Sequence, residues 1–236
     1  MTTAGPSRQN VEKMFDAISS TYDRVNRVMT LGIDAYWRKK LCQLVPKRKK
    51  LRILDGATGT GDQILALMKN CDDIKEIIGI DLAHEMLKIG RDKIKEQGFE
   101  EKVSLIEGSL QEIPFKAHFF DCATIAFGIR NVTDVALTLK EMHRILKPGG
   151  KLLILECSMP KNKVLKSGYL IYLRYLLPKI GGLISKNKQA YVYLNQTIES
   201  FPCGGAFCNL LKTAGFIKVK ALPLTGGAVT IYSGDK

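Results

Sequence analysis

The chain of 236 residues lacks the patterns that mark metal-binding and secreted proteins. Its six cysteines include no CxxC pair, and none of its three histidines stands at metal-ligand spacing from a cysteine. Zinc sites are built from such groups, so we expect no metal centre. Scattered cysteines are typical of reduced thiols in a cytoplasmic protein. Residues 1–15 contain no positive n-region followed by an apolar stretch, so we also expect no signal peptide.

The chain also lacks the roughly twenty uninterrupted apolar residues that are needed to span a bilayer. Its most apolar segment, VLKSGYLIYLRYLLPKIGGLISK at 164–186, is interrupted by Arg174, Pro178–Lys179 and Gly181–Gly182. This pattern favours an interfacial or lid element, in which basic side chains contact anionic headgroups while Leu, Ile and Tyr cover an apolar ligand. A helix pair with one solvated face is the alternative.

Acidic residues are missing from two segments, and the net charge of +13 is concentrated there. Residues 38–52 hold eight basic residues and residues 161–188 hold seven, while the rest of the chain is close to neutral. Such patches face nucleic acid or an anionic membrane surface, and a solvated charged face is the alternative.

From residue 51 onwards, short apolar runs alternate with longer amphipathic stretches. Strands are predicted at 51–55, 76–81, 103–108, 119–127 and 151–157, and helices at 61–70, 84–96 and 134–146, the last closed by KPGG. Continuous apolar strands that alternate with helices predict an α/β fold, with a mostly parallel sheet covered on both faces.

The length and the single alternating pattern predict one domain over residues 1–236. We divide it into an N-terminal helical segment that covers the site (8–44), a cofactor-binding core (45–158), a basic, apolar substrate or lid segment (159–200), and a C-terminal helix with closing strands (201–236).

Ligands of open parallel sheets bind at the carboxyl ends of the strands, and the loop DGATGTGD at 55–62 follows the first predicted strand. This loop is no triphosphate-binding P-loop, because Asp62 and Gln63 stand where Lys and Ser or Thr are required. The dinucleotide fingerprint fails at Ile64, where it requires glycine. The loop glycines permit close backbone approach, and Asp55 with Asp62 favours a cationic cofactor. S-adenosyl-L-methionine, with its sulfonium and ammonium groups, fits this loop.

The next two predicted strands also end in polar groups. Asp81 follows Gly61 by twenty residues and is placed to accept both ribose hydroxyls of an adenosine. A helix N-cap is the alternative for Asp81. Ser109 is placed to hydrogen-bond an adenine amino group, with Leu110 against the ring, and a plain turn is the alternative there.

Five longer stretches carry a resemblance to a known family. They are YDRVNRVMTLGIDAYW (22–37), LDGATGTGD (54–62), FGIRNVTD (127–134), RILKPGGKLLILECS (144–158) and LTGGAVTIYSG (224–234). Together they resemble the ubiquinone/menaquinone biosynthesis C-methyltransferase family, from about Val11 to the C-terminus. The resemblance implies a class I S-adenosylmethionine-dependent methyltransferase fold, Rossmann-like, with a mostly parallel seven-stranded sheet, helices on both faces and additional N-terminal helices.

The resemblance also implies a reaction and a substrate. The reaction is methylation of a ring carbon of a polyprenylated quinol, either demethylmenaquinol or its benzoquinol counterpart in ubiquinone biosynthesis. The short N-terminus and the TGG near the C-terminus are more similar to the menaquinone members. In the family pattern the cofactor contacts fall on Thr60, Asp81 and Ser109–Leu110, and Gly59 and Gly61 complete the predicted cofactor-binding set. The chain departs from the pattern at Val25, Asp34, Gly56, Ala126 and Cys157.

Arg130 and Asn131 end the apolar run at 119–127, and the implied chemistry gives this polar pair a role. A quinol ring carbon becomes nucleophilic when a neighbouring hydroxyl loses its proton. The guanidinium of Arg130 stays protonated at neutral pH, so we predict that it stabilises the phenolate and orients a water, while Asn131 fixes that water or the second ring oxygen. Tyr22, with Asp23, is expected to close over the site. A surface salt bridge for Arg130 and a helix cap for Asn131 are the alternatives.

Two other classes of function compete with this prediction. The basic charge is compatible with a nucleic-acid methyltransferase, but AFGIRN lacks the Pro-Pro-aromatic signature of adenine amino-methylating enzymes, so we expect no nucleic-acid partner. A non-catalytic cofactor-binding scaffold is the other. The predicted partners are a polyprenylated quinol and an anionic membrane surface, which would place a cytoplasmic protein at the inner face of the membrane. The sequence leaves open whether the chain forms a homo-oligomer.

Overall fold

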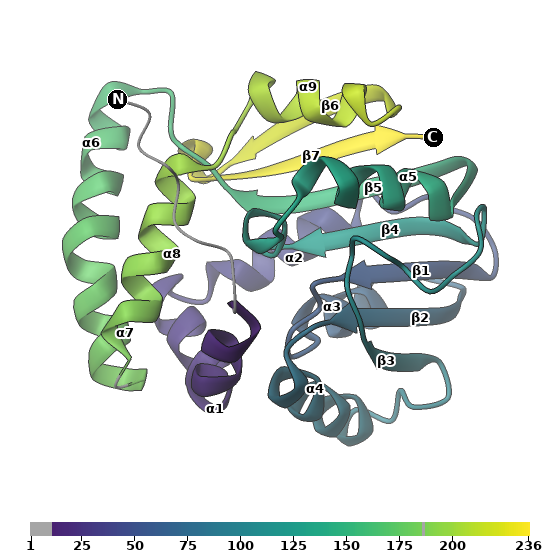
Figure 1. Cartoon of the computed structure of the whole chain (residues 1–236), viewed down its shortest axis with the longest axis horizontal. Helices are drawn as coiled ribbons and strands as arrows, with labels where there is room; N and C mark the ends of the chain where they lie inside the picture. The colour runs from purple at the N-terminus through teal and green to yellow at the C-terminus, as the bar shows by residue number, and fades with distance from the viewer. Residues whose placement is uncertain (1–10, 186) are drawn as a thin grey trace.

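A seven-stranded sheet is the centre of the protein in a computed structural model that describes residues 11–185 and 187–236 (Figure 1). Its strands are β1 (Leu51–Gly56), β2 (Ile74–Asp81), β3 (Val103–Glu107), β4 (Phe120–Ala126), β5 (Leu146–Cys157), β6 (Ile217–Leu224) and β7 (Val229–Asp235). Their order across the sheet is β3-β2-β1-β4-β5-β7-β6. Strands β1 to β5 pair in parallel, and β7 runs antiparallel to both of its neighbours. The predicted α/β class with a mostly parallel sheet is confirmed.

The strand order reverses at β1, which lies between β2 on one side and β4 on the other. Both β1 and β4 are buried along most of their length, which is why their sequences are continuous apolar runs rather than alternating ones. The reversal leaves a crevice beyond the carboxyl ends of these strands, where the following loops diverge to opposite faces. Any ligand of the sheet is therefore expected at this edge.

Helices cover both faces of the sheet (Figure 1). One face packs against α2 (Ile33–Cys42), α3 (Asp62–Asn70) and α4 (His84–Glu96), and the other against α5 (Val135–Ile145) and α9 (Gly205–Thr213). Each face has its own apolar core, formed where the 3.6-residue apolar stripe of a helix meets the strands.

A group of helices, here termed the helical cap, lies beyond the carboxyl ends of the parallel strands (Figure 1). It consists of α1 (Val11–Met29), α6 (Lys163–Ile171), the π-helical turn η2 (Tyr172–Leu176), α7 (Leu177–Ser185) and α8 (Lys188–Ser200). Helix α7 packs against both α1 and α8, and a third apolar cluster fills the space between them. Gly181 permits the α7–α8 approach, since a Cβ there would lie 2.3 Å from the ring of Tyr191.

The structure confirms the predicted N-terminal helices and corrects one boundary that the sequence pattern predicts. The helical segment 8–44 contains α1 and α2, and Leu31 and Gly32 separate them with left-handed backbone conformations. The motif KPGG, predicted to close a helix, lies within β5, and α5 already ends at Ile145. Residues 8–10 of the first segment and Lys186 of the basic segment 161–188 lie outside the described residues.

None of the described helices is long and apolar enough to cross a membrane.

Candidate active site

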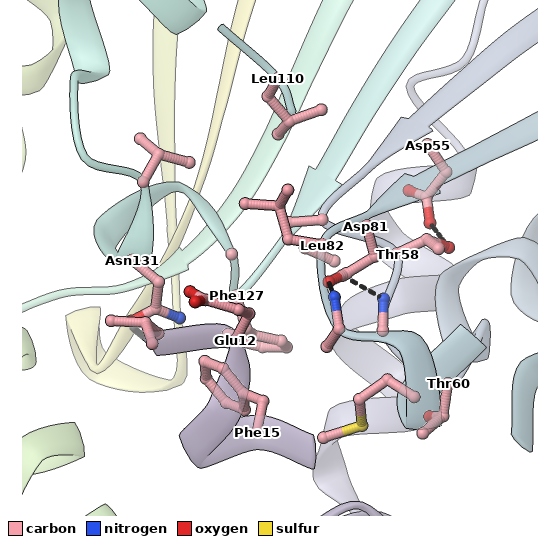
Figure 2. Close-up of a pocket in the computed structure, with 18 of the residues that line it drawn as sticks. Glu12, Phe15, Asp55, Thr58, Thr60, Asp81, Leu82, Leu110, Phe127 and Asn131 are labelled. Carbon is pink, nitrogen blue, oxygen red and sulfur yellow. Dashed lines mark hydrogen bonds between the residues drawn. The ribbon is translucent and has the colours of Figure 1, made fainter. Parts of the chain in front are cut away.

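Two cavities adjoin at the carboxyl edge of the sheet. The first, here termed the polar cavity, has a volume of about 210 Å³ and lies against the loops that follow β1, β2, β3 and β4 (Figure 2). The second, here termed the apolar cavity, has a volume of about 310 Å³ and lies between the sheet edge and the helical cap. Four side chains line both cavities and form the wall between them: Phe15, Tyr22, Arg38 and Phe127.

The glycine loop after β1 forms the floor of the polar cavity. Gly59 and Gly61 have φ of 53° and 79°, in the left-handed region that favours glycine. The N–H of Gly61 donates to the carbonyl of Thr58 at 2.9 Å, which closes the turn before α3. Apart from its chain neighbours, no heavy atom of the described residues lies within 4 Å of a Cβ built on Gly59, so the loop backbone faces open space on that side. The loop therefore permits the close backbone approach that the sequence predicts.

Asp81, at the end of β2, joins two loops that border the polar cavity. Its carboxylate accepts the N–H of Gly59 at 2.7 Å and that of Ala83 at 2.9 Å (Figure 2). Asp81 is therefore not the N-cap of α4, which is Ala83, and one of its hydrogen bonds fixes the glycine loop. Burial raises the pKa of Asp81, although these backbone donors favour the charged form.

Asp55 is a second buried carboxylate beside the polar cavity. It accepts the hydroxyls of Thr58 at 2.6 Å and Thr124 at 2.5 Å. Burial raises its pKa from 3.8 to about 6, although both hydrogen bonds favour the carboxylate. A cationic ligand nearby would stabilise the charged form, so this site suits a positive charge.

The raised pKa of Asp55 predicts a pH-dependent penalty on stability. Because the pKa of Asp55 is higher in the folded than in the unfolded protein, protonation of this carboxyl favours the folded state. The resulting contribution to stability is fully present below pH 4 and is lost as the pH rises through 6. Asp55→Asn is therefore expected to raise the free energy of unfolding at pH 7.5 by about 1–3 kcal/mol, and by much less at pH 4. Urea unfolding at the two pH values measures this, with the exposed Asp72→Asn as control. Equal effects at both pH values would contradict the assignment.

Helix α1 is tied to the glycine loop by an ionic network. The hydroxyl of Thr60 donates to Asp23 at 2.6 Å, and the ammonium of Lys93 donates to Asp23 at 2.9 Å and also to Asp62. Burial works against the charge of Asp62, but Arg38 and Lys93 outweigh it and lower the pKa. The N-terminal helix is therefore anchored directly over the loop.

The apolar cavity is lined mostly by apolar and aromatic side chains from the helical cap and α2. They include Met14, Ile18, Met29, Leu31, Ile33, Trp37, Tyr169, Tyr172, Leu173, Leu177 and Leu194. Tyr172 donates its hydroxyl to the carbonyl of Met29 at 2.8 Å, and its ring stacks with that of Tyr169, so η2 is tied to the end of α1 within the helical cap. Such a lining suits a large apolar ligand that carries few polar groups.

Arg130 forms a buried ion pair on the wall of the apolar cavity. Its Nη1 donates to Glu156 Oε1 at 2.6 Å and to the carbonyl of Phe127 at 2.6 Å. Arg130 is only 3% exposed, so the surface salt bridge considered from the sequence is wrong in its location. Burial alone would lower the pKa of Arg130, but Glu156, with Cys157 and Tyr22, raises it, so the guanidinium cannot act as a base. Its buried Nε has no hydrogen-bond partner among the described residues.

Phe127 adopts an unusual backbone conformation on the wall between the cavities. Its φ is 61°, a strained value for an aromatic residue. The strain is held by hydrogen bonds at both ends of the residue, because its N–H donates to the carbonyl of Leu155 at 2.7 Å and its own carbonyl accepts from Arg130. Gly128 follows because a Cβ there would lie 2.4 Å from that of Ala57. The motif FGIR thus fixes the Phe127 ring on the wall.

The structure brings most of the predicted site residues to one place. Those that line the polar cavity are Tyr22, Gly59, Thr60, Asp81, Ser109, Leu110 and Asn131. Arg130 lines the apolar cavity instead, and Gly61 lies at the N-cap of α3. Asn131 is not a helix cap, because Asp134 accepts the N–H of Leu137 at 2.9 Å and caps α5. The buried Oδ1 of Asn131 has no partner within residues 11–185 and 187–236.

Sequence reasoning missed Glu156 and Lys93. Glu156 is an acid at the end of an apolar strand, which is the same signal that indicates Asp81. Lys93 lies on an amphipathic helix among other lysines, and nothing local distinguishes it.

The strand order, the antiparallel β7 and a glycine loop followed by an acid at the end of β2 define a class I S-adenosylmethionine-dependent methyltransferase. The buried carboxylates beside the glycine loop fit the positive charge of that cofactor. The chain belongs to the ubiE/COQ5 methyltransferase family, whose model matches residues 1–236.

The relatives agree with this membership. The chain is 40% identical to demethylmenaquinone methyltransferase of Bacteroides fragilis, over 98% of this chain and 94% of that protein. It is 41% identical to the ubiquinone/menaquinone biosynthesis C-methyltransferase UbiE of a Geobacter species, over 97% of each. A SAM-dependent methyltransferase structure from Thermotoga maritima, 22% identical, matches 95% of this chain and 99% of its own with a TM-score of 0.65. This last likeness shows the fold.

Proposed function

We propose that the protein methylates a ring carbon of a polyprenylated quinol, with demethylmenaquinol converted to menaquinol. The observation that carries the proposal is the pair of adjoining cavities, one polar with buried acids and one lined by apolar side chains. The two cavities share four lining side chains, so a methyl donor in one and an aromatic acceptor in the other would lie next to each other. The names of the relatives from Bacteroides fragilis and Geobacter point to the same class of substrate.

The polar cavity would hold S-adenosylmethionine, which supplies an electrophilic methyl group. Gly59, Thr60 and Gly61 would lie along the cofactor, with Asp81 on the ribose and Ser109–Leu110 at the adenine. All of these except Gly61 line the cavity. Asp81 already binds two backbone groups, and its carboxylate oxygens have lone pairs left for hydroxyl donors.

The apolar cavity would hold the quinol ring and the first part of its tail. Its volume of about 310 Å³ exceeds that of the polar cavity, and residues of the 159–200 segment form much of its wall. This supports the proposal that the segment covers the substrate. Burying an isoprenoid tail against these side chains contributes on the order of 25 cal/mol per Å².

Arg130 would act on the quinol oxygen through its guanidinium, because the residue lines the apolar cavity. The ion pair with Glu156 balances its charge, so the group is a fixed hydrogen-bond donor rather than a free cation. A donor held in place stabilises a developing phenolate without reorganisation. Asn131 Oδ1, which lacks a partner in the part of the chain that the structure describes, would hold a water or the second ring oxygen. Tyr22, on the wall, would close the site over both reactants.

Comparison of acceptors tests the proposed substrate. The purified protein is incubated with methyl-labelled S-adenosylmethionine and prenylated 1,4-naphthoquinol or benzoquinol of equal tail length, and label in the lipid extract is counted. We expect faster transfer to the naphthoquinol. Faster transfer to the benzoquinol would assign the ubiquinone step instead, and cofactor binding without label in either lipid would favour a non-catalytic scaffold.

We further propose that the helical cap contacts an anionic membrane surface. Exposed apolar side chains gather on it, among them Val164 (80% exposed), Leu176 and Leu183 (82%). Basic residues of the 161–188 segment lie between them in the sequence. This combination is typical of interfacial helices, and it would let a lipid-borne substrate reach the apolar cavity from the bilayer.

Vesicle co-sedimentation tests the membrane contact. Val164→Asp/Leu183→Asp is expected to reduce binding to anionic vesicles at low salt by at least about tenfold, because it places two charges at the acyl boundary. Leu137→Asp, at an exposed site on α5 outside the cap, serves as the matched control. If the wild type does not bind such vesicles, or if both variants bind as it does, the proposed contact is wrong.

A further inference from the structure

Arg38 holds the positive charge on the wall of the polar cavity. Within the described part of the chain it is the one basic residue that lines this cavity, whereas the acids there are Glu12, Asp55, Asp62 and Asp81. Its side chain is largely buried, at 13% exposure. A cation beside a cavity lined by acidic side chains has two possible roles. It balances their negative charge, and it can bind an anionic group of the ligand.

The guanidinium of Arg38 is not saturated by its neighbours. Its buried Nε has no hydrogen-bond partner among residues 11–185 and 187–236. The acid in ion-pair range is Asp34, whose Oδ2 lies 4.0 Å from Nε, beyond hydrogen-bond distance. Asp34 Oδ1 already accepts Thr30 at 2.9 Å and Arg27 at 3.3 Å. A buried donor on a charged group is costly to leave unpaired. Arg38 also lines the polar cavity, so its guanidinium is available to an acceptor that binds there.

The position of Arg38 also selects which part of the cofactor it meets. Its charge acts on Asp62 and Asp55, at the end of the cavity formed by the glycine loop and the start of α3. Ser109 and Leu110, proposed to lie at the adenine, follow β3 on the other side of β2. The guanidinium carbon of Arg38 lies 5.4 Å from the centroid of the Phe127 ring, and this cation–π contact holds Arg38 beside the wall.

We propose that Arg38 binds the α-carboxylate of the amino-acid group of S-adenosylmethionine, while Asp55 and Asp62 face the α-ammonium. The inference deepens the proposed cofactor site and rests on it. A guanidinium matches a carboxylate through two parallel N–H donors, so it orients the group as well as attracting it. Because Arg38 also lines the apolar cavity, a carboxylate held there anchors the methionine end of the cofactor at the boundary with the acceptor.

Calorimetric titration with two ligands isolates this contact. S-adenosylhomocysteine carries the carboxylate, and S-adenosyl-3-thiopropylamine is the same molecule without it. The wild type is expected to bind the first about 10- to 100-fold more tightly, the range of a hydrogen-bonded charge pair. Arg38→Gln is expected to bind both with nearly equal affinity. Lys39→Gln removes the same charge from an exposed position on the same helix, and it should keep the wild-type ratio.

Two further measurements separate the contact from a loss of structure. 5′-Methylthioadenosine, which lacks the whole amino-acid group, should bind the wild type and Arg38→Gln equally well. Arg38→Lys, which keeps the charge but not the paired donors, should retain a reduced ratio, and it decides the matter if Arg38→Gln does not fold. The proposal is overturned if Arg38→Gln keeps the wild-type ratio, or if the wild type does not discriminate. If the wild type binds none of the three ligands, the proposed cofactor site itself fails.

Discussion

Glu156→Leu is expected to lower the free energy of unfolding by about 3–5 kcal/mol, because it leaves the buried guanidinium of Arg130 without its counter-charge. The substitution also removes the acceptor of the Cys157 N–H, at 2.8 Å, and of Arg130 Nη1. The remaining partner of Nη1 is the carbonyl of Phe127, which cannot neutralise the charge. Few substitutions outside the apolar core should have so large an effect.

Removing both charges tests whether the effect comes from the unpaired ion. Arg130→Met/Glu156→Leu fills a similar volume with apolar atoms, and it is expected to recover most of the loss, since an ion pair and an apolar pair are often close in stability. Urea unfolding of the wild type, the two single variants Arg130→Met and Glu156→Leu, and the double variant gives the coupling energy directly. A double variant as unstable as the sum of its single changes would show that the two residues act independently.

The same double variant is expected to bind S-adenosylhomocysteine like the wild type but to transfer methyl groups about 10²- to 10³-fold more slowly. The reason is that Arg130 lines the apolar cavity and its guanidinium is the donor proposed for the phenolate. Arg130→Ala alone is a weaker test, because it leaves Glu156 buried and unpaired and would lose activity by unfolding.

A control variant keeps the donor while changing the charge. Glu156→Gln retains a hydrogen-bond acceptor for Arg130, so the guanidinium should stay in place and turnover should fall far less than in the double variant. Single-turnover rates at saturating cofactor measure the methyl-transfer step for all three proteins. If the double variant turned over at the wild-type rate, Arg130 would only hold Phe127 and the protein core, and its proposed role at the substrate would be wrong.

The core of the fold could be predicted because its signals are local. Apolar runs buried on both faces, such as 51–55 and 119–127, fix the parallel strands, and their order along the chain fixes the crossover pattern. The prediction that KPGG closes a helix is wrong because glycine and proline indicate that a helix ends. They do not indicate whether the residues that follow already pair with a neighbouring strand. Here Leu146 pairs with Phe120.

Site residues could be predicted from the sequence only where they directly follow a predicted strand. Asp81 and the glycine loop stand out by position alone, since each follows an apolar run. The partners of Arg130 and Thr60 could not be read in this way, because Glu156 and Asp23 are brought to them by the sheet register and by the docking of α1. The apolar cavity depends on how the helices of the helical cap pack against one another, and the sequence pattern of a single helix does not indicate this packing.

Arg38 shows how composition can hide a site residue. In the sequence it begins a run of basic residues and counts toward a surface patch. In the structure it turns toward the two cavities, whereas Lys47, Arg48, Lys49 and Lys50 are exposed on the loop before β1. The difference arises because α2 presents one face to the sheet, and Arg38 lies next to Trp37 on the buried part of that face.

The most direct test of the proposed function is the position of the transferred methyl group. The protein is incubated with S-adenosylmethionine carrying a ¹³C methyl and with a prenylated 1,4-naphthoquinol whose ring has one unsubstituted carbon beside the tail. The expected product shows the label as a methyl bonded to that ring carbon in its ¹³C NMR spectrum, with loss of the ring proton. A labelled methoxy group would mean that the enzyme methylates oxygen, and it would contradict the proposed C-methylation of a quinol.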